Sequence, residues 1–156
     1  MPMIPMKNIV VLVDLSDLTF KVLKQAHFLA VAFKSRVVIL HVVPKEPAMV
    51  QVGLSSPVIL QDPPPERVHQ HHARLIEMRD SLVKYGVDAV VRQMVGASVE
   101  SVLEETRKLG ADLIILGSHH HSTIYHLLVG SMADDVLKHA HCPVLVVPGD
   151  EPAQAK

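Results

Sequence analysis

The chain has 156 residues, of which 49% are apolar and 20% charged, a balance typical of a globular domain and not of a disordered chain. Its 15 basic and 16 acidic residues nearly cancel, and it has no Trp, two Tyr and three Phe, so we expect no nucleic-acid partner. The apolar run at residues 9–13 is too short to span a bilayer, and the N-terminus lacks a signal-peptide layout. We therefore expect a cytoplasmic protein with no membrane partner.

Five short runs rich in Val, Ile and Leu predict strands that are buried on both faces. They lie at residues 8–14, 36–43, 87–95, 112–116 and 143–147. Segments with helical periodicity separate them. Strands that alternate with helices predict an α/β fold, a single doubly wound five-stranded parallel sheet with helices on both faces.

The predicted helices have recognisable ends. The first carries apolar residues from Leu18 to Phe33, with Ser16 or Asp17 as its cap. The second covers residues 65–85 before Gly86, and the third begins after Ser98 and ends at Gly110. The last starts at Ser131 and ends before residues 142–143. We expect a single domain over residues 1–156, with a mobile Pro-rich loop at 44–64 and a frayed tail at 149–156.

Polar and glycine residues gather where strands end. Asp14 closes the first strand, Gly96 follows the third, Gly117 follows the fourth, and Gly130-Ser131 precedes the last helix. Ligands of open parallel sheets bind beyond the carboxyl ends of the strands, and a helix N-terminus attracts phosphate. A carboxylate accepts hydrogen bonds from ribose hydroxyls. This pattern predicts a nucleotide with its sugar near the first strand and its phosphates near the last helix.

Each of these residues also has a plainer interpretation. Asp14 is equally suited to cap the first helix. Gly117 can simply end its strand, and Gly130-Ser131 can simply begin the last helix. Neither a Walker motif nor G-x-G-x-x-G is present. Only the joint placement favours a site.

The histidines and the cysteine suggest no chemistry of their own. The clusters at 69–72 and 119–121 lack the spacing of a metal site, so we expect no metal ligands, and His41 is interpreted as a structural histidine in a buried strand. Nothing predicts a reactive Cys142, and no nucleophile elbow occurs. We expect no enzyme activity beyond slow hydrolysis of the nucleotide at most.

Residues 112–147, DLIILGSHHHSTIYHLLVGSMADDVLKHAHCPVLVV, resemble the C-terminal signature of the universal stress protein family. That signature is a glycine, two residues, a second glycine, nine residues, then Gly-Ser or Gly-Thr. Gly117, Gly130 and Ser131 fall in register with it, and NIVVLVDLSD and RVVILHVVP resemble the family's first two strands. The resemblance implies strand order 3-2-1-4-5 and a regulatory role in stress response.

The resemblance also implies a bound ATP or AMP, with Mg²⁺ as an optional companion. Carried over, Asp14 meets the ribose, while the Val13 backbone and Val42 flank the adenine. The residues expected near the base or around the phosphates are Val95, Gly96, Gly117, Gly130 and Ser131.

One position departs from the family pattern, because His120 replaces the second glycine of the signature. Two outcomes follow: the imidazole blocks the phosphate channel, giving a nucleotide-free dimeric partner-binding protein, or it turns outward or contacts a phosphate itself. The other site residues favour retained binding.

The last strand predicts self-association. As an apolar sheet edge it would be a liability in a monomer, and pairing with its own copy about a two-fold axis hides both edges. The resemblance implies the same antiparallel homodimer. The residues expected at this interface are Val144, Leu145, Val146 and Val147.

Overall fold

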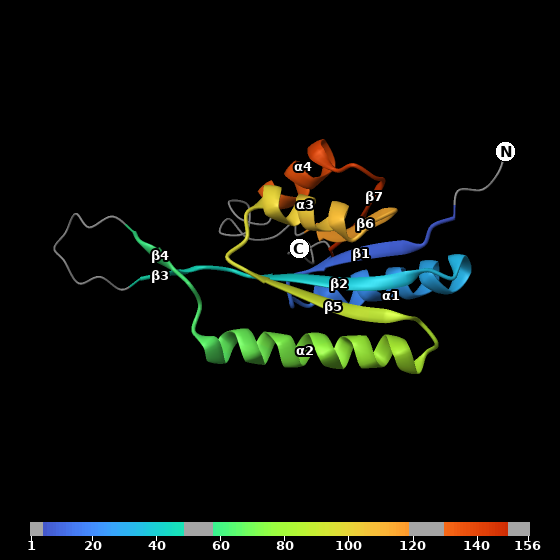
Figure 1. Ribbon diagram of the computed structural model, residues 1–156, viewed down its shortest axis with the longest axis horizontal. Helices are drawn as coiled ribbons and strands as arrows, with labels where there is room; N and C mark the ends of the chain where they lie inside the picture. Colours follow the sequence, from blue (N-terminus) through green and yellow to red (C-terminus); the bar gives the residue numbers. More distant parts are fainter. Residues whose placement is uncertain (1–4, 49–57, 119–129, 150–156) are drawn as a thin grey trace, which may run out of the picture.

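The computed structural model describes residues 5–48, 58–118 and 130–149, without the side chains of residues 130 and 131. Its main sheet has five parallel strands in the order β5-β2-β1-β6-β7 (Figure 1). The strands are β1 (Asn8–Val13), β2 (Arg36–Val43), β5 (Ala89–Val95), β6 (Leu113–Ser118) and β7 (Val144–Pro148). Counted over these strands alone, the order is 3-2-1-4-5, so the predicted fold class and strand order are confirmed.

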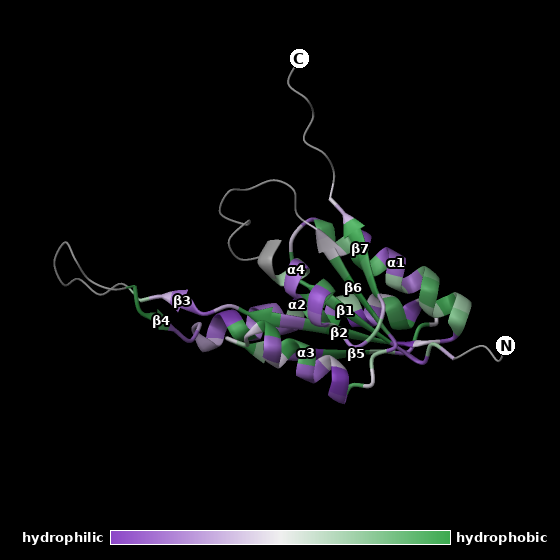
Figure 2. Ribbon diagram, turned by 90° about the horizontal axis from the view of Figure 1, so that it is seen from above, coloured by the Kyte–Doolittle hydropathy of each residue, from purple (hydrophilic) through white to green (hydrophobic). Residues whose placement is uncertain are grey.

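Helices cover both faces of the sheet. The first face packs against α1 (Leu18–Phe33) and α2 (Pro65–Lys84), and the second packs against α3 (Val99–Lys108) and α4 (Gly130–His139). Figure 2 views the sheet from above, with α1 and α3 on opposite sides of it.

Two hydrophobic cores follow from the alternation of side chains along each strand. In β1, Ile9 and Val11 face the core under α1 and α2, whereas Val10 faces the core under α3 and α4. All three side chains are fully buried, and each stabilises the fold by roughly 1.5–3 kcal/mol. A strand between two cores must be apolar at every position, which explains the continuous runs of the sequence.

The helix ends follow the predicted signals closely. Gly86 has a φ of +84°, and the Ser98 hydroxyl accepts a 3.2 Å hydrogen bond from the Ser101 amide. At the start of α1, Asp17 holds the cap position without a side-chain cap bond, while the Ser16 hydroxyl accepts from the Leu18 amide at 3.3 Å. Of the two predicted caps, Ser16 is therefore the one that makes such a bond.

The Pro-rich connection contains structure that was not predicted. β3 (Glu46–Pro47) and β4 (Leu60–Gln61) form a short antiparallel ribbon, which projects from the sheet in Figures 1 and 2. An ion pair between Glu46 and Arg67 joins the ribbon to α2. Residues 49–57 of the mobile loop predicted at 44–64 and residues 150–156 of the predicted frayed tail lie outside the described part of the chain, so the mobility of both stays a prediction.

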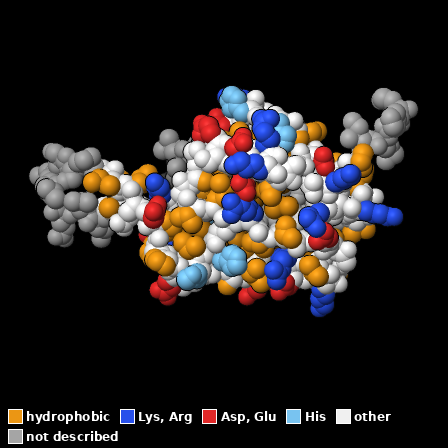
Figure 3. Space-filling view, viewed as in Figure 1, with side chains coloured by type: hydrophobic (Ala, Val, Ile, Leu, Met, Phe, Trp, Pro, Cys, Tyr) orange, Lys and Arg blue, Asp and Glu red, His pale blue; other side chains and the backbone are white. Residues whose placement is uncertain are grey.

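Charged side chains of both signs lie on the described surface (Figure 3). Within the described ranges, no helix combines the length and the apolar character needed to cross a bilayer. The face in Figure 3 carries Lys and Arg interspersed with Asp and Glu.

Candidate functional site

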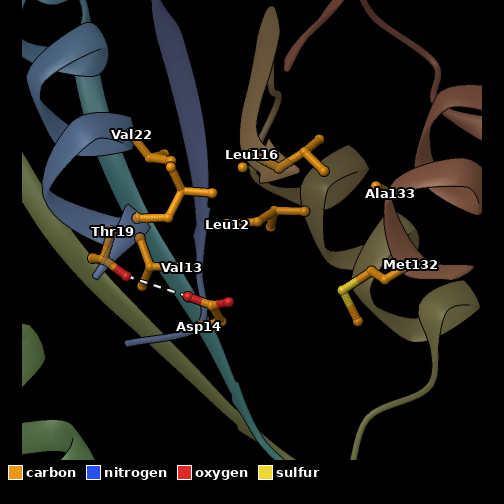
Figure 4. Close-up of a pocket in the computed structure, with 10 residues that line it drawn as sticks. Leu12, Val13, Asp14, Thr19, Val22, Leu116, Met132 and Ala133 are labelled. Carbon is orange, nitrogen blue, oxygen red and sulfur yellow. Dashed lines mark hydrogen bonds between the residues drawn. The ribbon is translucent and has the colours of Figure 1, made fainter. Parts of the chain in front are cut away.

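A pocket lies at the topological switch point of the sheet, where the strand order reverses. The chain runs from β1 to β2 on one side, and after β5 it crosses through α3 to β6 on the other side of β1. At such a switch point the connections diverge and leave a crevice beyond the carboxyl ends of the strands. The pocket residues are Leu12, Val13, Asp14, Leu18, Thr19, Val22, Leu116, Gly117, Met132 and Ala133 (Figure 4).

The walls of this pocket are mostly apolar. Asp14 and Thr19 supply polar side chains on the α1 side, and Met132 and Ala133 belong to the first turn of α4 on the opposite side (Figure 4). The pocket is open to solvent and has a volume of about 70 Å³. One water needs about 10–15 Å³ on this measure, so the pocket holds a few waters and a nucleotide would have to continue along the ends of the neighbouring strands.

Asp14 supports the turn that follows β1. Its Oδ1 accepts hydrogen bonds from the Ser16 amide at 3.0 Å and from the Thr19 hydroxyl at 3.4 Å, although the residue is exposed. These bonds agree with the plainer interpretation of Asp14 as part of the helix start. Leu15, the next residue of this turn, has a φ of +61°, and its carbonyl accepts a 3.3 Å hydrogen bond from Arg74 Nη2 of α2. Holding a leucine there costs about 1–2 kcal/mol, so the turn is fixed by its partners.

Gly117 has a packing role that the sequence did not predict. A Cβ at this position would lie 2.8 Å from Leu18 Cγ and 3.3 Å from Val22 Cγ2, both in α1. The glycine therefore lets α1 lie close against the end of β6. Its contact with a phosphate stays a prediction.

Three of the predicted site residues lie on the same edge but outside the pocket. Val42 and Val95 are near the ends of β2 and β5, on the far side of β1 from β6. Gly96 has a φ of +59° and donates its amide to the Val43 carbonyl at 2.8 Å. A Cβ on Gly96 would lie 2.7 Å from Cε of Lys45, whose side chain covers it. Lys45 was missed because nothing in the sequence pairs it with Gly96.

The predicted phosphate end is described only in part. The backbone of α4 begins at Gly130, one residue before the predicted start, and its first turn contributes to the pocket. The side chain of Ser131 and all of His120 lie outside the described residues, so neither predicted role is tested.

A hydrogen-bonded histidine pair, of which His41 is buried and His71 half-buried, lies beside this edge. His41 is 3% exposed; its Nδ1 lies 2.7 Å from the Val13 carbonyl oxygen, and its Nε2 lies 3.0 Å from Nδ1 of His71 in α2. Because a carbonyl only accepts, Nδ1 of His41 donates, and in the neutral pair Nε2 accepts from His71. The interpretation of His41 as a structural histidine is confirmed. His71 was considered only as part of the cluster at 69–72, and its bond to His41 was not predicted.

Burial lowers the pKa of both histidines. For His41, desolvation outweighs the bond to Val13 and the attraction of Asp14, which raise the pKa. For His71, desolvation acts together with repulsion from Arg74 and Arg67. Both imidazoles therefore favour the neutral form.

The remaining candidates show no reactive chemistry. Burial raises the pKa of the Cys142 thiol, and the nearby Asp112 raises it further, so the thiolate is disfavoured. Within residues 5–48, 58–118 and 130–149, no group of three or more His, Cys, Asp or Glu side chains is placed to hold a metal ion.

Comparison with known proteins identifies the family. The model of the universal stress protein family matches residues 5–148. The chain belongs to the universal stress protein family. It is 32% identical to universal stress protein G of Escherichia coli O157:H7 over 146 residues, which is 90% of this chain and 98% of that protein. It is 29% identical to universal stress protein MJ0531 of Methanocaldococcus jannaschii over 141 residues, 90% of this chain and 81% of that protein.

Solved structures support the same fold. A universal stress protein in complex with cAMP superimposes with a TM-score of 0.68 at 24% identity, covering 94% of this chain and 99% of the other. The Archaeoglobus fulgidus universal stress protein in complex with dAMP gives 0.64 at 22% identity, covering 92% and 98%. At these identities the likeness establishes the architecture that universal stress proteins share.

Proposed function

We propose that this universal stress protein binds an adenine nucleotide at the pocket between β1 and β6 and acts as a regulator in stress response. One observation carries the proposal: the pocket lies at the switch point of the sheet, with Asp14 on one side and the first turn of α4 on the other. Two fold relatives were solved with cAMP and dAMP, which supports an adenine nucleotide as the ligand class.

In this proposal the nucleotide lies along the sheet edge. Adenine packs between Val42 and the Val13 backbone, with Val95 and Gly96 nearby, and the ribose meets the Asp14 carboxylate. Adjacent strands are about 4.8 Å apart, so β2 and β6 are separated by about 10 Å. The phosphates then reach Gly117, Gly130 and Ser131, where free amides at the start of α4 attract an anion.

ATP and AMP both suit this arrangement. Mg²⁺ would bind through the phosphates, because this ion keeps several waters and needs few protein ligands. Among the described residues that line the pocket, Asp14 is the one carboxylate and none is a histidine, so these residues supply no general base beside the phosphates. The proposed role is therefore nucleotide-dependent association, with hydrolysis slow at most.

The test starts from freshly purified protein. Denaturing it should release AMP, ADP or ATP detectable by mass spectrometry, and the stripped protein should bind AMP or ATP in calorimetry. Asp14→Ala should weaken binding by about tenfold or more, because a ribose hydroxyl loses a charged acceptor. Asp17→Ala is the matched control, since this exposed carboxylate is three residues away and makes no cap bond; it should leave affinity unchanged.

His120 supplies the second arm of the test. If wild type binds no nucleotide but His120→Gly does, the imidazole blocks the phosphate channel and the nucleotide-free alternative replaces this proposal. If neither binds, the nucleotide proposal fails.

We also propose a homodimer through β7. This strand pairs with β6 in the main sheet, and Val144, Leu145 and Val146 are only half-buried in the single chain. Pairing with a second β7 would cover these side chains and the strand's outward hydrogen-bonding groups.

A further inference from the structure

The outer side of α1 is unusually apolar. All three phenylalanines of the chain lie in this helix, and Phe20, Phe28 and Phe33 are 74%, 53% and 44% exposed. Val31 is 56% exposed. Phe20, Lys24, Phe28 and Val31 follow one another at intervals of four, four and three residues, which places them on one side of the helix. We call these four residues the α1 stripe.

The opposite side of α1 is already used. Leu18, Val22, Ala26 and Ala30 are buried against the sheet, so the helix is apolar on two opposite sides. Helices that are apolar all round are normally buried, and a surface helix normally turns polar residues outward. The α1 stripe therefore has the composition of a covered surface, although none of the described helices and strands lies over it; Figure 2 shows α1 at the outside of the molecule.

Aromatic contacts extend the stripe toward α2, and a cation lies at its centre. The His27 ring lies 5.8 Å from the Phe28 ring and 6.0 Å from the exposed Tyr85 ring at the end of α2. Lys24 Nζ lies 5.9 Å from the centre of the Phe28 ring. The charged residues of α1 itself are Lys21 and Lys24, and the exposed Asp17 precedes its first turn. Lys24 is therefore the charge at the centre of the stripe.

We propose that the α1 stripe docks an acidic amphipathic helix of a partner protein. From Phe20 to Val31 the stripe is about 16 Å long, which is about three helical turns. Apolar side chains of the partner would pack between Phe20, Phe28 and Val31, and a carboxylate would meet Lys24. This surface is separate from the nucleotide pocket and from the β7 edge.

Two other occupants fit the stripe less well. A second copy packed through the same surface about a two-fold axis would bring Lys24 of one α1 near Lys24 of the other. A bilayer would take the centre of the stripe deepest, which is where Lys24 stands, whereas interfacial helices carry cations on the polar side. Pairing through β7 extends the sheet in its own plane and does not cover an outward helix surface.

The test uses a synthetic probe with a charge swap. The first probe is a fluorescein-labelled helical peptide of about 18 residues, built from Leu, Ala and Glu, with one Glu in the middle of its apolar side. The second is identical except for Lys at that position. Fluorescence anisotropy should show the Glu probe binding at least about tenfold more tightly than the Lys probe. Lys24→Glu should reverse this preference.

Control variants distinguish specific docking from nonspecific hydrophobic binding. Phe28→Ser should weaken the Glu probe by about tenfold or more, as expected for an aromatic anchor. Leu137→Ser removes an exposed apolar residue of similar exposure from α4, on the other face of the sheet, and should change nothing. Circular dichroism melts confirm that each variant is folded; should Phe28→Ser unfold, the charge swap at Lys24 decides alone.

Several results would overturn the proposal. One is that neither probe binds up to about millimolar concentration, or that both bind equally. Another is that the protein sediments with anionic phosphatidylglycerol vesicles in a Phe28-dependent manner while ignoring the Glu probe, which would identify a membrane surface. A third is self-association on light scattering that Phe20→Ser abolishes, which would identify a second copy.

Discussion

At the residue scale, a hydrogen-bond chain links the end of β1 to α2. It runs from the Val13 carbonyl through the buried His41 of β2 to the half-buried His71 of α2. The neutral pair satisfies all four facing atoms, and a single added proton on Nε2 of His71, which takes no part in these bonds, leaves the chain intact. A second proton, on Nε2 of His41, would bring that N–H group directly against the N–H group at Nδ1 of His71.

This chain predicts how stability depends on pH. Both histidines have a pKa lowered by burial, whereas the unfolded chain titrates near pH 6.5. Between the folded and unfolded pKa values the unfolded chain binds more protons, so stability is complete above about pH 6.5 and falls as the pH drops further. Urea midpoints measured at about pH 7.5 and pH 5.5 should show this loss. A His41→Gln/His71→Gln variant with the same pH slope as wild type would contradict the assignment.

Gly117 predicts a coupled effect with Leu18. Gly117→Ala should destabilise the protein by about 1–3 kcal/mol, because the new methyl group overlaps a buried leucine. In a Leu18→Ala background the same change should cost much less, since the space is then empty. Chemical denaturation of the four proteins of this cycle measures the coupling, and additive costs would show that the close approach is unimportant.

Neither feature could be predicted from the sequence, for a shared reason. The need for glycine at 117 arises from the approach of Leu18, which is far away along the chain, and the partner of His41 is thirty positions away. Local pattern carries no information on such contacts. By contrast, Asp14 was singled out by its place at the end of a strand, and it does line the pocket. Its bonds to Ser16 and Thr19 agree with the capping alternative, and its contact with a ribose stays a prediction.

At the scale of the elements, α1 ends without the usual glycine. Lys34 caps it with a φ of +56°, its amide bonded to the Ala30 carbonyl. Lys34→Gly should stabilise the protein by about 0.5–1 kcal/mol, because the left-handed conformation then carries no Cβ penalty. Gln25→Gly, at an exposed position inside the same helix, should instead destabilise by a similar amount. If thermal denaturation shows that both changes destabilise, the cap geometry is wrong.

The long elements were predictable because their signals are redundant. β2 was predicted at its observed bounds, since an apolar run of strand length is unambiguous between two helical segments. The other main strands differ by one or two residues at their ends. The β3–β4 ribbon was missed because two residues on each side give no periodicity, and Pro47 argued against a strand.

At the scale of the whole molecule, the proposed dimer can be broken at a single backbone amide. The Ile114 amide donates a hydrogen bond to the Pro143 carbonyl. Because successive backbone amides of a strand point to opposite sides, the Leu145 amide points toward β6 and the Val146 amide points outward. Val146→Pro should convert a dimer into a monomer on light scattering while the fold survives. Leu145→Pro should destabilise the fold, because it removes a bond to β6. A wild type that is monomeric at about micromolar concentration would contradict the interface.

The position of the site was predictable, but its walls were not. Asp14 and Gly117 mark the ends of β1 and β6, and both line the pocket. Leu12, Leu116 and Met132 look like ordinary core residues in the sequence, and only the sheet order shows that they meet at a switch point. Val95 and Gly96 were placed near the base by resemblance, and they lie beyond β2, outside the pocket.

The central claim is that adenine nucleotide binds between β1 and β6. Methyl-labelled protein titrated with AMP and followed by NMR tests it most directly. We expect saturable shifts in the methyl signals of Leu12, Leu116 and Ala133, and none at Leu82, which packs near the C-terminal end of α2. Pocket methyl signals that stay still at about millimolar AMP, or shifts confined to methyl groups elsewhere, would contradict the account.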